Sequence, residues 1–172
     1  MPASLPHIKL FETRPKSAPR TPSTDTLKAC FEAAWCLAPR KQLPDLKLPD
    51  GWPAPKGYSG QLTLRIEIRF MNDRQIAKPN AEFMHHVGAT DVLSFPMGEY
   101  NPEFEAFDLG QIFLSYETAI REAAARKLPI EQEIARYAVH GFLHLLGYDD
   151  QTPAQFKRMH DVQEKVLKHA LK

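Results

Sequence analysis

The sequence predicts one globular domain that contains both helices and strands. Three observations carry this prediction: the chain has 172 residues, an alternating apolar segment follows residue 60, and helical apolar patterns fill the last third. A single domain usually has roughly 100–200 residues, so two domains would be unusually small. Hydrophobic residues at 43% and charged residues at 25% exclude collagen-like, coiled-coil and wholly disordered chains.

The first 60 residues are expected to hold a short strand, a helix and proline-rich connectors. Apolar residues at helical spacing predict the helix at 24–37, and the strand is expected at 7–11. Ten of the 15 prolines lie before residue 61, so we expect extended connectors over 12–23 and 38–60. Residues 1–60 then either join the domain formed by 61–172 or wrap around it.

The clearest strand signal begins at residue 61. Leu62, Leu64, Ile66 and Ile68 alternate with polar residues, which predicts a half-buried strand. Further elements are expected as follows: a helix from 72 that Pro79 interrupts, a strand over 91–95 that ends at Pro96, an exposed acidic loop over 97–108 carrying Glu99, Glu103, Glu105 and Asp108, and a strand over 111–114.

The C-terminal third is expected to be helical. Helices are predicted at 116–127, from 130 to 146, and from 152 to the end, where Thr152 and Gln155 fit a capping box. Between Ala138 and Leu146 the middle helix is apolar on all sides apart from two histidines, which is typical of a core helix.

Those two histidines form the strongest functional signal. His140 and His144 are four residues apart, so on a helix both rings emerge from one face. Gly147 lets the chain reverse, and Asp150 can return to supply a third ligand. This is the ligand spacing of the long zincin motif with aspartate in the third place. Three protein ligands leave one coordination position open, as in catalytic zinc sites.

A plainer interpretation makes each histidine a hydrogen-bonded core residue. Two buried histidines on one helix would then need separate partners, whereas one shared metal satisfies both. Zinc peptidases carry a glutamate general base directly after the first histidine, and here that position is Gly141. Peptidase activity of the usual kind is therefore not expected. Either the metal-bound water is deprotonated in another way, or the substrate brings its own nucleophile, as RNA does with its 2′-hydroxyl.

Two motifs give the chain a specific resemblance to a known family. The segment HGFLHLLGYD at 140–149 and the segment TDVLSFP at 90–96 are similar to the two signatures of the YbeY family of ribosomal RNA maturation factors, which are metal-dependent endoribonucleases. The resemblance covers about residues 62–172. It implies an α+β domain in which a small mixed four-stranded sheet packs with four to five helices, and a metal site on a C-terminal core helix.

The resemblance also implies a Zn²⁺ site and the residues around it. His140, His144 and Asp150 would bind the ion, although Ni²⁺ or Fe²⁺ would also accept these ligands. The segment at 90–96 would line a cleft. The candidate substrate-binding residues are Thr90, Asp91 and Ser94. The chemistry of imidazole, and not the resemblance, makes His85 and His86 the candidate catalytic residues beyond the metal site, because a histidine can shuttle a proton or contact a phosphate near neutral pH.

This chain departs from the family pattern at three positions. The third ligand is commonly histidine, and here it is Asp150. Met84 stands where the cleft arginine of the family aligns, and Gln111 stands where the family tends to have aspartate. These departures keep a second hypothesis open: a ribosome-associated factor that binds metal and cleaves RNA weakly or not at all. A small-substrate metallohydrolase or a facial-triad iron(II) oxygenase is a further alternative.

Charge and hydropathy limit the partners. Lys and Arg number 22 against 21 for Asp and Glu, which excludes a strongly basic coat protein, although residues 1–60 hold a modest basic surplus that could contact RNA or a ribosome. No segment reaches the roughly 18 apolar residues that a membrane helix needs, and the N-terminus lacks a secretion signal. We expect a cytoplasmic monomer with ribosomal RNA, the ribosome or ribosomal proteins as partners and no membrane contact.

Overall fold

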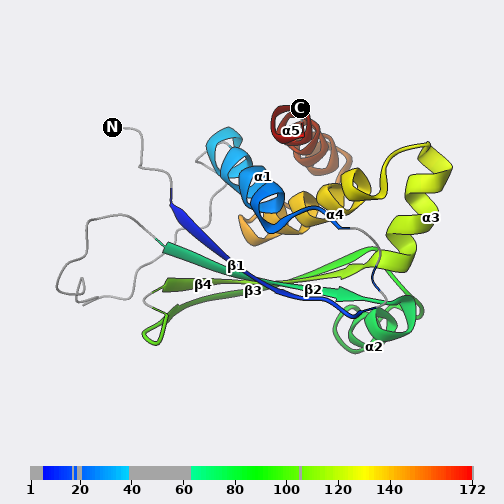
Figure 1. Cartoon of the computed structure of the whole chain (residues 1–172), viewed down its shortest axis with the longest axis horizontal. Coiled ribbons are helices and arrows are strands. Elements are labelled where there is room, and N and C mark those ends of the chain that lie inside the picture. Colours follow the sequence, from blue (N-terminus) through cyan, green and yellow to red (C-terminus); the bar gives the residue numbers. More distant parts are fainter. Residues whose placement is uncertain (1–5, 17, 19–20, 39–62, 105, 172) are drawn as a thin grey trace.

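The computed structural model contains one mixed sheet and the helices that pack on it (Figure 1), and it describes residues 6–16, 18, 21–38, 63–104 and 106–171. This architecture confirms the predicted α+β class. In chain order the elements are β1 (His7–Thr13), α1 (Thr24–Leu37), β2 (Thr63–Met71), α2 (Asp73–Met84), β3 (Val92–Asn101), β4 (Ala106–Ser115), α3 (Tyr116–Arg126), α4 (Ile130–Leu145) and α5 (Pro153–Ala170).

The sheet has the strand order β1-β2-β4-β3. The β1–β2 and β2–β4 pairs are parallel, whereas β3 pairs with β4 in antiparallel fashion. Helices α1, α4 and α5 lie over one face of the sheet, and α2 lies at the other (Figure 1). The sheet therefore has one well-covered face, and α4 is placed between that face and the outer helices.

Alternation along β2 decides which face is the core. Leu64, Ile66, Ile68 and Phe70 are buried, while the residues between them are partly exposed on the opposite face. The buried side chains pack against α1 and α4, where the rings of Phe31 and Phe142 stack with centroids 4.4 Å apart. Burial of this apolar area is the main force that holds α4 on the sheet.

Helix α4 lies in tight contact with the sheet at Gly141. A Cβ atom at this position would lie 2.8 Å from Ile112 Cγ2 and 2.9 Å from Ser94 Oγ. The Ser94 hydroxyl also donates a hydrogen bond of 3.2 Å to the Gly141 carbonyl. The glycine that replaces the peptidase glutamate is therefore a packing position, and it sets the height of His140 above β3.

Two prolines do not end their elements, contrary to our expectation. Pro79 lies inside α2, which continues to Met84 because Asn80 anchors its second half: the buried Asn80 amide donates to the Gly88 carbonyl at 3.0 Å. Pro96 lies inside β3, which continues to Asn101. β3 is an edge strand, where a missing backbone donor is tolerated, and its register shifts just after this proline.

The prediction of an acidic loop over 97–108 is wrong, because strands occupy most of this range. β3 and β4 continue toward each other as a hairpin, and the fourth strand covers Ala106–Ser115 rather than 111–114. Glu99 and Glu103 are exposed as expected, but Asp108 is only 6% exposed. Its carboxylate lies 3.0 Å from Arg65 Nη1 and also accepts from the Asn101 amide, which makes it part of the sheet.

The helices of the covered face agree closely with the sequence prediction. α1 has the predicted bounds, α3 and α4 each end one residue early, and α5 begins with the predicted capping box. The connector over 38–60 and the first two residues of the strand predicted from 61 lie outside the described residues, apart from Ala38. Within the described part of the chain no helix is long and apolar enough to cross a membrane.

Candidate metal centre

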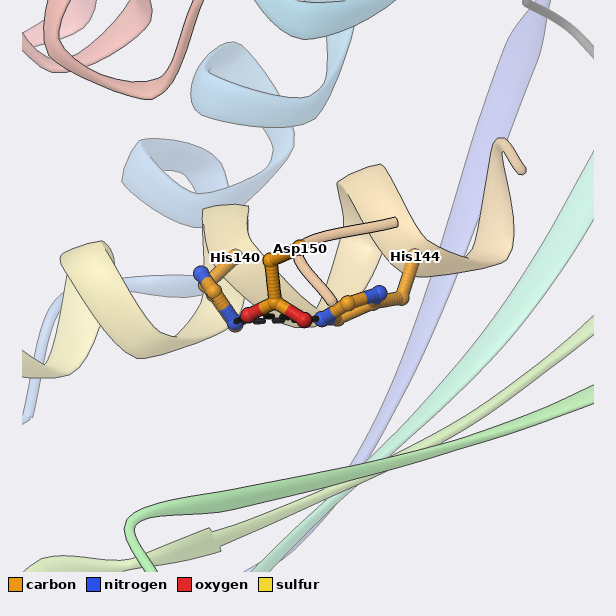
Figure 2. Close-up of side chains that lie close together, drawn as sticks. All are labelled: His140, His144 and Asp150. Carbon is orange, nitrogen blue, oxygen red and sulfur yellow. Dashed lines mark hydrogen bonds and ion pairs between the residues drawn. The ribbon is translucent and has the colours of Figure 1, made fainter. Parts of the chain in front are cut away.

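Helix α4 presents two imidazole rings on one face. His140 and His144 are one turn apart, and their Nε2 atoms lie 3.1 Å from each other (Figure 2). Two ligands held at 2.0–2.1 Å in tetrahedral geometry are separated by roughly 3.3 Å. The spacing of the two nitrogen atoms therefore suits ligands of one small metal ion.

The turn after α4 brings a carboxylate to the same point. Gly147 adopts a φ of 85°, and Tyr148 N donates to the Leu143 carbonyl at 3.0 Å, so the chain reverses at the C-terminus of the helix. Asp150 Oδ2 then lies 3.6 Å from His140 Nε2 and 3.9 Å from His144 Nε2. The three predicted ligands converge, and Figure 2 shows the carboxylate between the two rings.

Hydrogen bonds at the far side of each ring determine where its proton lies. His144 Nδ1 is 3.0 Å from the Tyr148 carbonyl, which can only accept, so this nitrogen carries the proton. His140 Nδ1 is 3.1 Å from Gln163 Oε1, while the amide nitrogen of Gln163 faces Glu164. In the neutral tautomer with its proton on Nδ1, each ring presents the lone pair of its Nε2 atom, and the two Nε2 atoms point toward each other.

The electrostatics of this arrangement favour a cation. Burial lowers the pKa of His140, and the neighbouring His144 ring lowers it further, so the ring is neutral at neutral pH. Two imidazole nitrogens and a carboxylate oxygen converge here, and a divalent ion bound between them would stabilise this arrangement. Two imidazoles and a carboxylate are a ligand set that suits Zn²⁺ and that Ni²⁺ and Fe²⁺ also accept.

Two of the three side chains lie at a cavity of about 280 Å³. His140 and Asp150 line it, together with Asp91 at the start of β3. The Asp91 carboxylate is oriented by hydrogen bonds from Thr90 Oγ1 at 3.1 Å and from Val92 N at 2.9 Å. The structure thus brings one predicted substrate-binding residue beside the metal ligands and places Thr90 directly behind it.

Other predicted residues lie away from this cavity. Ser94 faces α4 and bonds to the Gly141 carbonyl. His85 and His86 are exposed after α2, and neither lines the cavity. Their assigned roles in substrate binding and catalysis stay predictions.

Two of the three departures from the family pattern, Met84 and Gln111, lie apart from the cavity. Met84, 39% exposed, is the last residue of α2. Gln111 lies on the open face of the sheet, where its amide donates to Glu67 at 2.9 Å. Neither side chain lines the cavity beside His140.

Sequence reasoning missed most of the cavity wall. Besides the residues already named, the lining includes side chains of α3, α4 and α5: Arg126, Arg136, Tyr137, Phe156, Met159 and His160. Gln163, which orients His140, was also missed. Helical spacing carried a partial signal, because Arg136 and Tyr137 lie one turn before His140 on the same helix. No spacing links the residues of α3 and α5 to that face.

The chain matches a described family of proteins. The family model "Endoribonuclease YbeY" matches residues 54–171. A curated Endoribonuclease YbeY of Anaeromyxobacter sp. (strain Fw109-5) is 41% identical over 100 residues, which cover 58% of this chain and 51% of that protein. A protein of the same name from Thermus thermophilus is 37% identical over 102 residues, covering 59% of this chain and 73% of that protein.

The aligned region is thus about half the length of several curated relatives; for the Endoribonuclease YbeY of Myxococcus xanthus it is 40%. A solved structure agrees on the fold: the solution structure of TM1509 from Thermotoga maritima superposes with a TM-score of 0.51 at 20% identity, covering 95% of this chain and 88% of that one. Since the family model matches more than half of the sequence, the chain belongs to the YbeY family.

Proposed function

We propose that this protein is a metal-dependent endoribonuclease that acts in the maturation of ribosomal RNA. One observation carries the proposal: two imidazole nitrogens and a carboxylate oxygen converge within 3.9 Å, and two of these three ligands, His140 and Asp150, line a cavity. The name Endoribonuclease YbeY, which its relatives bear, supports RNA as the substrate. We further propose ribosomal RNA and the ribosome as partners, and the cytoplasm as the location.

In this proposal His140, His144 and Asp150 hold one divalent ion, with Zn²⁺ the first candidate. The bound ion would act as a Lewis acid toward the scissile phosphate. The protein prepares the site in advance, because Gln163 and the Tyr148 carbonyl fix both ring orientations. Ring reorientation then adds no cost when the ion binds.

The side chains near the ligands suggest how the strand is held. Asp91, oriented by Thr90, lines the cavity next to His140 and can accept a hydrogen bond from a ribose hydroxyl. Gly141 offers no general base where a peptidase has glutamate, and its close contact with Ile112 leaves no space for one. We therefore propose that the 2′-hydroxyl of the substrate supplies the nucleophile.

Cleavage of ribosomal RNA with and without EDTA tests the proposal. The wild type should cleave the RNA, EDTA should abolish cleavage, and His144→Ala should lose both bound metal and activity. His169→Ala is the matched control, because His169 is exposed on α5 and does not line the cavity. Tight RNA binding without cleavage would instead identify a binding factor, and cleavage that resists EDTA would contradict the metal site.

A 2′-deoxy substitution at the cut site tests the nucleophile separately. Cleavage at that position should stop, while cleavage of the unmodified RNA continues under the same conditions. Continued cleavage of the modified strand would show that water is the nucleophile, without affecting the metal assignment.

A further inference from the structure

The cavity beside the metal ligands has a second wall, formed by side chains that the metal site does not use. Arg126 comes from the end of α3, Arg136 and Tyr137 from α4, and Phe156 and His160 from α5. The cavity extends over about 280 Å³. It combines cations, a buried hydroxyl and an aromatic surface directly next to His140 and Asp150.

The two arginines are held in place from behind. Glu133 is fully buried and lies 3.4 Å from Arg126 Nη1 and 3.3 Å from Arg136 Nε. Arg136 Nη1 also pairs with Glu164. Neither glutamate lines the cavity, whereas both arginines do. The carboxylates therefore orient the guanidinium groups, and Nη2 of Arg136 has no hydrogen bond or ion pair to the described residues.

Tyr137 provides an independent sign of a ligand. The side chain is 4% exposed and lines the cavity, and its hydroxyl has no hydrogen-bond partner among the residues that the structure describes. An unpaired buried hydroxyl is unfavourable unless another molecule satisfies it. Burial raises the pKa of Tyr137, so the hydroxyl keeps its proton and can donate to an anionic oxygen.

The outer rim of the cavity carries an exposed aromatic side chain. Phe156 is 54% exposed, and its ring stacks on His160 with a centroid distance of 5.8 Å and an interplanar angle of 24°. Large exposed aromatic rings beside cationic groups are the usual surface on which single-stranded nucleic acids stack their bases. Other described exposed aromatic rings, such as Phe83, lie outside this cavity.

We infer that this cavity binds one nucleotide of the RNA strand next to the scissile bond, with Tyr137 and Arg136 on its phosphate and Phe156 against its base. Arg126 adds positive charge at the mouth of the cavity. This inference rests on the proposed endoribonuclease function and adds a subsite to it. It assigns Tyr137, Arg136 and Phe156 to substrate binding rather than to the chemical step.

Binding of a fluorescent single-stranded 2′-O-methyl RNA oligonucleotide tests the inference, since this probe carries no free 2′-hydroxyl. With zinc-loaded full-length protein, Phe156→Ala should weaken binding about 10-fold through loss of base stacking. Tyr137→Phe, which removes only the hydroxyl, should weaken it about 5-fold. Phe83→Ala is the matched control, because Phe83 is 57% exposed and lies on α2 outside the cavity.

Arg126 allows a test of charge, since its side chain is 47% exposed and the buried Glu133 keeps Arg136 as a second partner when Arg126 is replaced. A plot of log affinity against log salt concentration has a negative slope. Arg126→Gln should make this slope less steep by about 0.7, the value for one phosphate contact on a single strand. Arg74→Gln, at an exposed position of α2, should leave the slope unchanged. The zinc content of every variant should equal that of the wild type. A cooperative melting transition shows that each variant is folded, including Arg126→Gln, which loses one partner of the buried Glu133.

The outcomes separate this subsite from the proposed function. If the wild type cleaves RNA but Phe156→Ala and Tyr137→Phe bind the probe within twofold of the wild type, the subsite is wrong and the function stands. Equal weakening in Phe83→Ala would also overturn the subsite. If the wild type neither binds nor cleaves RNA, the proposed function fails and the subsite fails with it.

Discussion

The Gln163 side-chain oxygen accepts a hydrogen bond of 3.1 Å from His140 Nδ1 and so joins α5 to the ring that faces the metal site. Gln163 is only 6% exposed, and its amide nitrogen faces Glu164. The orientation of the amide is thus fixed from both ends. The ring orientation of His140 depends on a residue 23 positions away in the chain.

Gln163→Met should weaken zinc binding by about 10–100-fold, the usual effect of removing a hydrogen-bond partner of a metal-binding histidine. Methionine has a similar volume but cannot accept the Nδ1 proton in the same way, so the ring loses its orientation. Competition with a chromogenic chelator measures the affinity. Gln151→Met, in the exposed turn before α5, is the control, and an unchanged affinity in Gln163→Met would remove this role.

Zinc should raise the melting temperature of the wild-type protein. An ion present at 100 times its dissociation constant stabilises the folded state by about 2.7 kcal/mol, which corresponds to about 5–10 °C for a chain of this size. His144→Ala should show no shift, and His169→Ala should show the full shift. Differential scanning calorimetry with and without zinc gives the answer, and an equal shift in His144→Ala would exclude the proposed site.

Local rules explain why much of this fold could be predicted. The helix ends follow from side-chain caps, such as Ser23 before α1 and the capping box of Thr152 and Gln155 before α5. The geometry of the candidate site could also be predicted from the spacing of His140, His144 and Asp150, because one helix and one glycine turn bring the three side chains together. No long-range contact was needed for these predictions.

Predictions that depended on long-range context were wrong or incomplete. Pro96 was expected to end a strand, but an edge position tolerates it, and edge positions are set by the order of strands in the sheet. Asp108 was expected in a solvent-exposed loop, but it forms an ion pair with Arg65 on the neighbouring strand. Arg126 and Tyr137 reach one cavity from two helices, and no sequence spacing indicates that convergence.

Gly141→Ala should destabilise the protein by about 1 kcal/mol. Overpacking lowers the free energy of unfolding by about 1–3 kcal/mol, while the better helix propensity of alanine raises it by about 1 kcal/mol. The clash with Ile112 Cγ2 is hard to relieve, because a β-branched side chain has little rotamer freedom. Urea unfolding measures the change, and a stabilised variant would show that α4 can move away from the sheet.

Asp73 at the start of α2 makes stability depend on acid. Its partial burial raises the pKa, but hydrogen bonds from Ser115 at 2.5 Å, Arg121 at 2.6 Å and Thr118 at 2.9 Å outweigh burial and hold the pKa below its usual range. The unfolded value is about 3.9. The carboxylate therefore stabilises the fold fully above that value, and this contribution is lost as the pH falls through the folded-state pKa.

Asp73→Asn should therefore reduce the free energy of unfolding by about 1–2 kcal/mol at pH 7, and the difference from wild type should shrink toward pH 2. Urea unfolding at a series of pH values measures both. Asp161→Asn is the matched control: the hydrogen bond from Lys157 also lowers the pKa of Asp161, but this ion pair is exposed on α5 and contributes little. A difference between Asp73→Asn and wild type that stays constant with pH would mean that the charge of Asp73 does not matter, because only a contribution from the ionised carboxylate can disappear in acid.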